Sequence, residues 1–246
     1  MIENGYKKEL NITYSDIEHN YNLKPYAILN FLQDIASVHA EKTDFGYTYM
    51  NKHNYLWFLL KYRMEFFEYP KDIGNITLIT APRGYSKLFM RRDFEFWKDN
   101  KNIARITSLW AIIDTKTRSM LRPQIAIPDN PLVVPYVKNE DDMAFEKLNP
   151  LTRIDLKESF KVRYSDLDIN KHANNANYIV WALEPLDFDF KTNNRLKTLD
   201  IVYKKEAKYS ETVSVEIELK ENNTTSHLIK NEQNEELCQI QCMWDK

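Results

Sequence analysis

A run of acidic, amide and imidazole side chains stands out in YSDLDINKHANNANYIVW, residues 164–181. It places Asp166, Asp168, Asn170, His172 and Asn174 at alternate positions. Alternate side chains of an extended backbone point to the same side, so the spacing predicts carboxylate, amide and imidazole groups on one face. Histidine titrates near neutral pH, and these groups together suit general acid–base catalysis.

The same stretch runs into a predicted helix. Asn174 or Asn175 can cap a helix over about residues 175–184, which Pro185 ends. A helix amino terminus offers unpaired backbone N–H groups and a partial positive charge, which would polarise a carbonyl and hold a developing oxyanion. Segments rich in Asp and Asn before helices are also commonly turns and caps. Spacing alone therefore leaves a catalytic and a purely structural interpretation open.

An internal repeat indicates how these residues are positioned. Residues 14–17 read YSDI and residues 164–167 read YSDL, and in each half a helix-like segment and then strand-like segments follow. The offset of 150 residues predicts duplication of one supersecondary unit. The first copy has Asn22 where the second has His172. We therefore expect the first half to be an inactive copy.

The periodicity predicts an α+β fold. Apolar residues at helical spacing predict a long helix over about 25–41. Strand-like runs follow it, and Val213, Val215, Ile217 and Leu219 alternate with polar residues as in a half-buried strand. Each unit would be a helix wrapped by an antiparallel sheet, with the two sheets joined edge to edge. The expected divisions are residues 1–122, a proline-rich linker or crossover over 123–155, and residues 156–246.

Composition narrows the function class. The chain has 246 residues and a net charge of −2, which gives no overall basic field for nucleic acid. Its longest strongly apolar run, residues 56–60, is too short to span a bilayer, and the polar start resembles no secretory signal. Cys238 and Cys242 are expected to be reduced and partly buried, without a metal. We expect a cytoplasmic protein that uses no cofactor.

The stretch 164–181 resembles the active-site signature of plant and bacterial acyl-acyl-carrier-protein (acyl-ACP) thioesterases. That signature has the form D-x-N-x-H-x-N-N, and here it is Asp168, Asn170, His172, Asn174 and Asn175. A second element of the family, a basic pair followed by Glu, matches KKE at residues 204–206. Further similar pieces are Trp57, the run MRRD at 90–93, and TR at 117–118.

The resemblance implies two tandem hotdog folds and hydrolysis of fatty acyl thioesters on acyl carrier protein, which ends chain elongation in fatty acid biosynthesis. It implies Asp168, Asn170, His172 and Glu206 as catalytic residues. Family members often have Cys after this Glu, but here the residue is Ala207, which excludes a cysteine nucleophile at that place. Either an activated water attacks the thioester, or Asp168 or Glu206 attacks it and forms an anhydride.

The first half would then form the acyl-chain pocket, with candidate lining residues Phe31, Leu32, Ile35, Trp57 and Phe58. These residues suit a plain core equally well. An acidic carrier protein would dock on cations, and the candidates are Lys204, Lys205, Arg91 and Arg92.

Three alternatives stay open: an acyl-coenzyme A thioesterase, an enoyl-thioester hydratase, and a non-catalytic protein that senses acyl thioesters. The preferred acyl length and a homodimeric state are also undetermined by the sequence.

Overall fold

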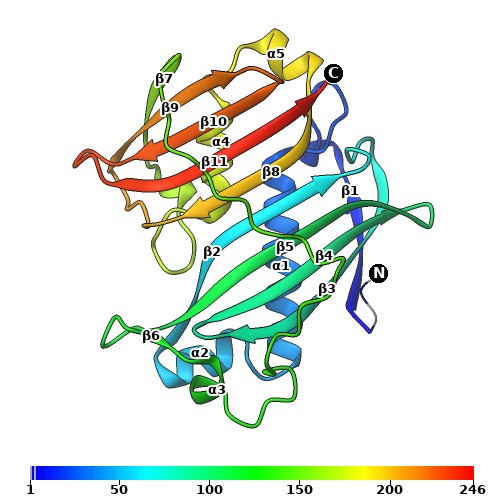
Figure 1. Cartoon of the computed structure of the whole chain (residues 1–246), viewed down its shortest axis with the longest axis vertical. Coiled ribbons are helices and arrows are strands. Elements are labelled where there is room, and N and C mark those ends of the chain that lie inside the picture. The colour runs from blue at the N-terminus through cyan, green and yellow to red at the C-terminus, as the bar shows by residue number, and fades with distance from the viewer. Residues whose placement is uncertain (1, 3) are drawn as a thin grey trace.

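The computed structural model describes residue 2 and residues 4–246. Within this part, the strands form one antiparallel sheet and the two longest helices, α1 and α4, lie against one of its faces (Figure 1). The helices and strands of the first half and of the following segment are β1 Tyr6–Ile12, α1 Pro25–Lys42, α2 Tyr47–His53, β2 Tyr55–Phe66, β3 Gly74–Ser86, β4 Phe89–Lys98, β5 Lys101–Asp114, β6 Met120–Leu121 and α3 Pro123–Ala126. Those of the second half are β7 Leu156–Lys161, α4 Asn175–Leu183, α5 Phe188–Asn193, β8 Arg195–Tyr203, β9 Thr212–Lys220, β10 Thr224–Lys230 and β11 Glu236–Asp245.

The strand order shows that the two halves repeat one topology. It runs β1-β3-β4-β5-β2-β8-β11-β10-β9-β7, with the short β6 paired to β5. The halves meet where β2 and β8 pair antiparallel, from Lys61 opposite Val202 to Glu65 opposite Thr198. Joining at these strands removes one exposed edge from each half. The predicted α+β class, with two helix-and-sheet units joined edge to edge, is confirmed.

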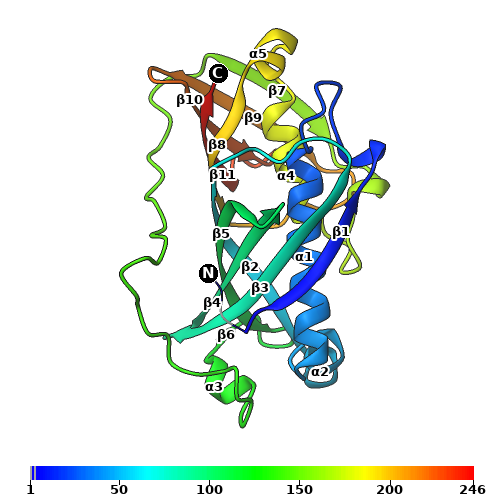
Figure 2. The ribbon, with the colours of Figure 1, turned by 90° about the vertical axis from the view of Figure 1, so that its right-hand side faces the viewer.

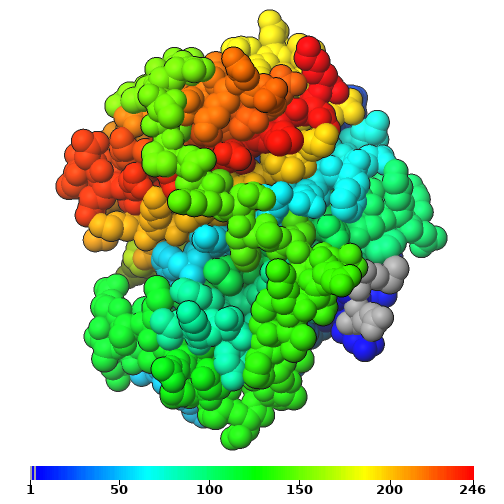
Figure 3. Space-filling model, viewed as in Figure 1, coloured from blue at the N-terminus to red at the C-terminus, as the bar shows by residue number. Residues whose placement is uncertain are grey.

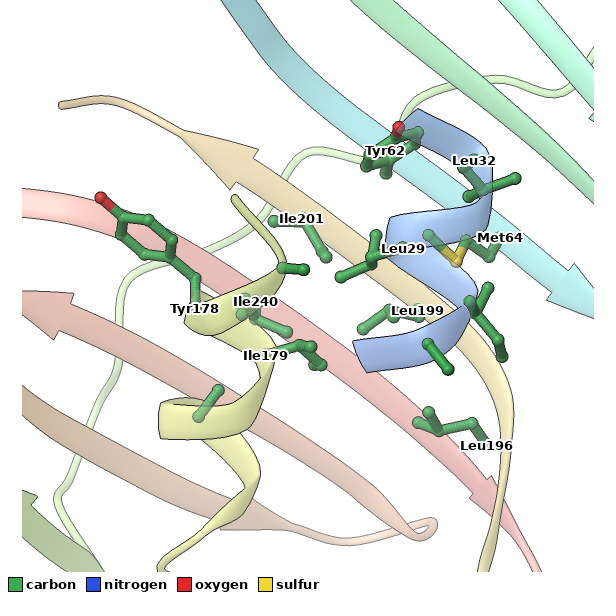
Figure 4. Packing of buried hydrophobic residues seen from close by; sticks show 14 of the residues in the cluster. Leu29, Leu32, Tyr62, Met64, Tyr178, Ile179, Leu196, Leu199, Ile201 and Ile240 are labelled. Atoms are coloured by element: carbon green, nitrogen blue, oxygen red, sulfur yellow. The ribbon is translucent and has the colours of Figure 1, made fainter. Parts of the chain in front are cut away.

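Helices α1 and α4 pack beside each other on the inner face of the sheet (Figures 1 and 4). Figure 4 shows Leu29 and Leu32 of α1 near Met64 of β2, with Ile179 of α4 nearby. All four side chains are at most 1% exposed. Burying such a side chain contributes roughly 1.5–3 kcal/mol, so this shared core holds the two halves together.

The linker covers the opposite, outer face of the sheet (Figures 2 and 3). After α3, residues 127–155 contain no helix or strand, but they are held at several points. Arg91 donates to the carbonyl of Met143 at 2.6 Å, and Arg63 lies 3.4 Å from Glu146. Polar residues of the outer face are buried beneath this cover. Burial raises the pKa of Asp200 there to about 6, although its partner Arg63 lowers it.

The strand over residues 212–220 departs from the predicted alternation. Leu219 is 37% exposed, whereas Glu216 and Glu218 are buried. Glu218 accepts hydrogen bonds from Thr152 of the linker, and Glu216 pairs with lysines of the neighbouring strands. The cover and these pairs allow the carboxylates to be buried. The sequence patterns did not predict β1, α2, β6, α3, β7 or α5.

Candidate active site

The stretch before α4 is a closed turn and not the extended segment that its alternation predicted. Tyr164–Asp166 form a 3₁₀ turn, and the N–H of Asp168 donates to the carbonyl of His172 at 2.8 Å. Lys171 has a positive φ of 65°. Asp166 is 2% exposed and accepts hydrogen bonds from the backbone and side chain of Arg163. The expectation that Asp166 faces the same side as Asp168, Asn170 and His172 is therefore wrong.

The side chain of Asp168 stabilises the turn that contains Asn170 and His172. Its Oδ1 accepts the backbone N–H of Asn170 at 2.8 Å and the backbone N–H of His172 at 3.2 Å. The side chain of Asn170 donates to the other carboxylate oxygen at 3.5 Å. Asp168 thus acts on His172 through the backbone, and the structure records no contact between its carboxylate and the imidazole.

Glu206, which is 34 positions after His172, lies beside its imidazole. Nδ1 of His172 is 3.2 Å from Oε2 of Glu206. The two segments are aligned by a bridge between His172 and Lys208 and by a hydrogen bond of 2.9 Å from the N–H of Ala173 to the carbonyl of Ala207. The distance fits an ion pair, but within the described residues Nδ1 has no hydrogen bond of good geometry. Such contacts often tighten only when substrate is bound.

Burial and four neighbouring charged groups shift the pKa of the Glu206 carboxyl group. Its pKa is raised above the ordinary glutamate value, chiefly because burial disfavours the charged form, and the charge of Asp168 adds to this. The charges of His172, Arg118 and Lys208 act in the opposite direction and lower that pKa. Since Arg118 follows β5, a residue of the first half acts on a carboxylate of the second.

The amino end of α4 adjoins this pair. The side chain of Asn174 caps the helix by accepting the N–H of Ala176 at 2.9 Å. The backbone N–H of Asn174 donates to the carbonyl of Asp166 at 2.8 Å. Among the described residues, no acceptor is recorded for the backbone N–H of Asn175. One N–H at this positive end is therefore left for an oxyanion.

Sequence reasoning missed three residues that support the site. The hydroxyl of Tyr178 accepts the N–H of Ala207 at 2.8 Å, and Asn177 donates to the carbonyl of Asp166 at 2.7 Å. Gln33 of α1 donates to the side chain of Asn174 at 3.4 Å. Asn177 and Tyr178 stand one residue beyond the ANN of the signature, after Ala176, where polar residues on a buried helix turn could have been noticed.

One turn beyond Gln33, Ser37 lines a cavity of about 80 Å³ between α1 and the sheet of the first half. We call it the α1–β4 cavity; Trp57, Met90 and Trp110 are among its lining residues. Of the five residues suggested for an acyl pocket, only Trp57 lines it, and Leu32 and Ile35 are fully buried in the core.

Cys238 and Cys242 are buried and lie on β11. Burial raises the pKa of both thiols, which makes them poor nucleophiles. No group of three or more metal-binding side chains is found in the described part of the chain, and no helix there is long and apolar enough to cross a membrane.

The proposed docking cations are not freely exposed. Arg92 is 6% exposed and the side chain of Arg91 is 10% exposed, so both assignments as docking residues are wrong. Adjacent residues of a strand point to opposite faces, and here the core covers one face and the linker the other. Lys204 and Lys205 are near the surface but pair with Glu236 and Glu235.

Two family models match this chain. Residues 3–127 match the acyl-ACP thioesterase N-terminal domain, and residues 151–246 match the acyl-ACP thioesterase C-terminal domain. The chain belongs to the acyl-ACP thioesterase family.

Curated relatives of this family member include two enzymes of Arabidopsis thaliana. The chloroplastic oleoyl-acyl carrier protein thioesterase 2 is 26% identical over 234 residues, which cover 87% of this chain and 63% of that protein. The chloroplastic palmitoyl-acyl carrier protein thioesterase is 27% identical over 226 residues, which cover 84% of this chain and 53% of that protein. The chain thus spans between about half and two thirds of these relatives.

Solved structures share the fold over nearly the whole chain. An acyl-ACP thioesterase from Bacteroides thetaiotaomicron superposes with a TM-score of 0.86 at 21% identity, covering 98% of this chain and 97% of that one. A protein from Lactobacillus plantarum described as an oleoyl thioesterase superposes with a TM-score of 0.88 at 22% sequence identity, and the match covers 99% of this chain and 98% of that one. The 12:0-ACP thioesterase from Umbellularia californica superposes with a TM-score of 0.85 at 19% sequence identity, and the match covers 98% of this chain and 96% of that one. These similarities confirm the tandem hotdog fold.

Proposed function

We propose that this chain hydrolyses the thioester between a fatty acyl chain and acyl carrier protein, which releases free fatty acid and ends chain elongation. The observation that carries the proposal is the 3.2 Å approach of Nδ1 of His172 to Oε2 of Glu206 at the amino end of α4. Membership of the acyl-ACP thioesterase family supports the choice of substrate.

The proposed reaction uses these two side chains as a base and its partner. The carboxylate of Glu206 holds the proton on Nδ1 of His172, which leaves Nε2 free to take a proton from water. The water oxygen attacks the thioester carbonyl, and the oxyanion is held by the backbone N–H of Asn175. When the carbon–sulfur bond breaks, His172 returns the proton to the carrier thiol. Acid and thiol are the products.

Asp168 and Asn170 have supporting parts in this proposal. Asp168 fixes the turn from which His172 projects, through the hydrogen bonds to the backbone N–H groups of Asn170 and His172. The side-chain amide of Asn170 would orient the attacking water or the substrate carbonyl. Asp168 is a positioning residue here, because it holds its neighbours and does not touch the reacting atoms.

Attack by a carboxylate is the alternative chemistry, and it would pass through an anhydride. One oxygen of Asp168 already accepts two backbone N–H groups, which makes Asp168 the weaker nucleophile of the two carboxylates. A single turnover in ¹⁸O-labelled water tests for the anhydride. Direct attack by water places the label in the fatty acid alone, whereas water that attacks the enzyme side of an anhydride leaves label in a carboxylate of the enzyme. Label in an enzyme carboxylate would therefore contradict direct attack.

We assign the acyl chain to the first half, residues 1–122, which acts as the inactive copy, and the chemistry to residues 156–246, with 123–155 as the crossover. The acyl chain of the substrate would enter the α1–β4 cavity, because Gln33 of α1 contacts the candidate site and Ser37, one helix turn further along α1, lines that cavity. At about 80 Å³ the cavity is small for a long acyl chain, so binding would require the lining side chains to move.

Carrier docking is assigned to cations at the site itself. Arg118 and Lys208 are exposed, both act electrostatically on Glu206, and neither side chain is in an ion pair within the part of the chain that the structure describes. They would meet the acidic carrier protein as the thioester enters. A cytoplasmic location and a homodimer stay predictions.

The direct test measures thiol release by the purified chain from dodecanoyl-ACP and from dodecanoyl-coenzyme A at matched concentrations. We expect a higher kcat/KM with the carrier-bound substrate, and loss of both activities in the His172→Ala variant. An equal or higher kcat/KM with coenzyme A would favour an acyl-coenzyme A thioesterase. No hydrolysis of either substrate would contradict the proposal.

A further inference from the structure

A second and larger cavity opens between the start of α1 and the helices α4 and α5. Its volume is about 450 Å³, within the range of roughly 300–1,000 Å³ that is usual for small-molecule pockets. Phe188 at this cavity is 65% exposed, whereas Trp244 and Leu196 are at most 5% exposed. The cavity therefore joins a buried apolar wall to the surface. We call it the α4–α5 cavity.

This cavity lies at the first-half counterpart of the candidate active site. The loop before α1 repeats the loop before α4: the 3₁₀ turn Tyr14–Asp16 matches Tyr164–Asp166, and the bridge from Ile17 to Leu23 matches that from Leu167 to Ala173. Tyr21 has the same positive φ of 65° as Lys171. The duplicated fold therefore builds the same loop before α1 and before α4.

The chemical groups differ between the two positions. Glu18 and Asn22, which line the α4–α5 cavity, stand where Asp168 and His172 stand in the second half. The N–H of Leu23 donates to the carbonyl of Pro70 at 2.9 Å, as Ala173 does to Ala207, so Tyr69 takes the place of Glu206. An amide and a phenol replace the imidazole and the carboxylate. His19 also lines the cavity, but its ring stacks on Phe188 at 4.9 Å and its Nε2 lies 3.2 Å from the hydroxyl of Thr192. The positions that match His172 and Glu206 therefore carry no general base pair.

The second half supplies an apolar wall. Ile179 and Leu183 of α4 line the cavity together with Leu196 of β8 and Trp244 of β11. Ile179, Leu196 and Trp244 are each at most 5% exposed. A hydrocarbon chain placed against this wall would leave water, which stabilises binding in proportion to the apolar area removed from solvent.

The charged groups of the cavity favour an anion. Lys24, Lys191 and Arg195 line it together with Glu18 and Glu184, which leaves one positive charge in excess. Lys191 lies 3.9 Å from Glu184, and the one hydrogen bond of the Lys24 ammonium to any described residue goes to the carbonyl of Ser15. Arg195 has no ion-pair partner within the described residues. Its guanidinium is therefore available for a carboxylate, which it can bind through two parallel hydrogen bonds.

We propose that the α4–α5 cavity is a non-catalytic binding site for a free medium-chain fatty acid, with the hydrocarbon tail against Ile179, Leu196 and Trp244 and the carboxylate at Arg195. The ligand has the chemistry of the reaction product, but binding needs only the cavity and the cation, so it does not depend on hydrolysis at His172. The occupant would contact α4, the helix whose other end carries the candidate active site.

The experiment measures equilibrium binding of radiolabelled dodecanoate, below its micelle concentration, to the intact chain and to two variants. Val180 lines the cavity and is 37% exposed, so a tryptophan there fills the cavity from the surface. We expect Val180→Trp to remove one class of binding site. Arg195→Glu should weaken the same class by about tenfold or more, as expected for loss of a charge-assisted hydrogen bond.

Matched controls isolate these effects. Val38 on α1 is 38% exposed and lines neither cavity, so Val38→Trp should leave dodecanoate binding unchanged. Lys197→Glu, two residues after Arg195 and outside the cavity, should also leave it unchanged. Dodecanol, which lacks the carboxylate, should bind more weakly than dodecanoate.

The proposal is overturned if both cavity variants bind dodecanoate within about twofold of the intact chain, if the intact chain does not bind it, or if dodecanol binds as tightly. Thioester hydrolysis is measured on the same samples, and Arg195→Glu should keep its kcat. Binding without any hydrolysis would contradict the proposed function and leave this site standing.

Discussion

Residues 14–24 and residues 164–174 follow the same backbone course at equivalent places in the two halves. In each loop an aspartate, Asp16 or Asp166, accepts the backbone N–H three residues before it at 2.8 Å, and this bond closes the 3₁₀ turn. The loops differ in the groups that they present: the second places His172 3.2 Å from Glu206, whereas Asn22 and Tyr69 stand at the matching positions of the first half. The fold thus builds the same scaffold twice, and a few side chains decide which copy can do chemistry.

The sharpest test of this difference changes the carboxylate and its first-half counterpart. Glu206→Gln keeps the size of the side chain but removes the charge that would hold the imidazole, so kcat should fall by roughly 10²-fold or more, the scale of general-base catalysis. Tyr69→Phe should change kcat less than about twofold, because Tyr69 is placed outside the reacting pair. Steady-state kinetics with dodecanoyl-ACP measures both, and equal losses would contradict the assignment.

The acid side of the pH profile sharpens the comparison further. Burial raises the pKa of Glu206, and the protonated carboxyl group cannot stabilise the imidazolium, so activity should fall as the pH drops through that raised value. Arg118 lowers the same pKa, so Arg118→Gln should move the acid limb to higher pH. Lys24→Gln, in the first-half loop, should leave it in place. If Arg118→Gln leaves the acid limb in place or moves it to lower pH, the ionisation of Glu206 does not govern that limb.

A smaller effect is expected for carrier docking. Lys208→Glu should raise KM for dodecanoyl-ACP by about threefold to tenfold at low salt, with a smaller change of kcat, because a repelled acidic carrier binds less well. Lys204→Glu is the control, since Lys204 already pairs with Glu236 and does not act on Glu206. Equal changes of KM in the two variants would place docking elsewhere.

The smallest predicted effect concerns the helix caps. Asn174 caps α4 through its side chain, whereas Lys24 makes no such bond at α1. Asn174→Ala should lower the free energy of unfolding by about 1 kcal/mol, the usual value for a lost cap. Lys24→Ala should change it by less than about 0.5 kcal/mol. Denaturant unfolding of both variants checks this, and equal losses would show that the cap contributes nothing specific.

The two longest helices, α1 and α4, and most strands were predictable because each has a periodic apolar face. The predicted helix over residues 25–41 matches α1 at Pro25–Lys42, and the predicted cap Asn174 stands at the start of α4. Periodicity also indicated the strand over 212–220, but Leu219 is exposed and its acidic neighbours are buried, because the linker covers that face. Contacts with a distant segment leave no periodic signal in the strand itself.

The candidate site was predictable by residue type more than by geometry. The alternation of Asp166, Asp168, Asn170 and His172 suggested one extended face, but local hydrogen bonds fold the segment into a turn and bury Asp166. Such bonds depend on side-chain-to-backbone competition, which alternation does not record. The nearness of Glu206 to His172 came from the family resemblance, because no spacing rule links positions on separate segments.

The most direct test of the central claim compares His172→Ala with Asn22→Ala, the same position in the two halves. The measurement is kcat for hydrolysis of dodecanoyl-ACP, with circular dichroism to show that both variants are folded. His172→Ala should lose roughly 10²-fold or more, since it removes the proposed base, and Asn22→Ala should stay within about threefold of the unchanged chain. Near-normal turnover by folded His172→Ala protein would contradict the account.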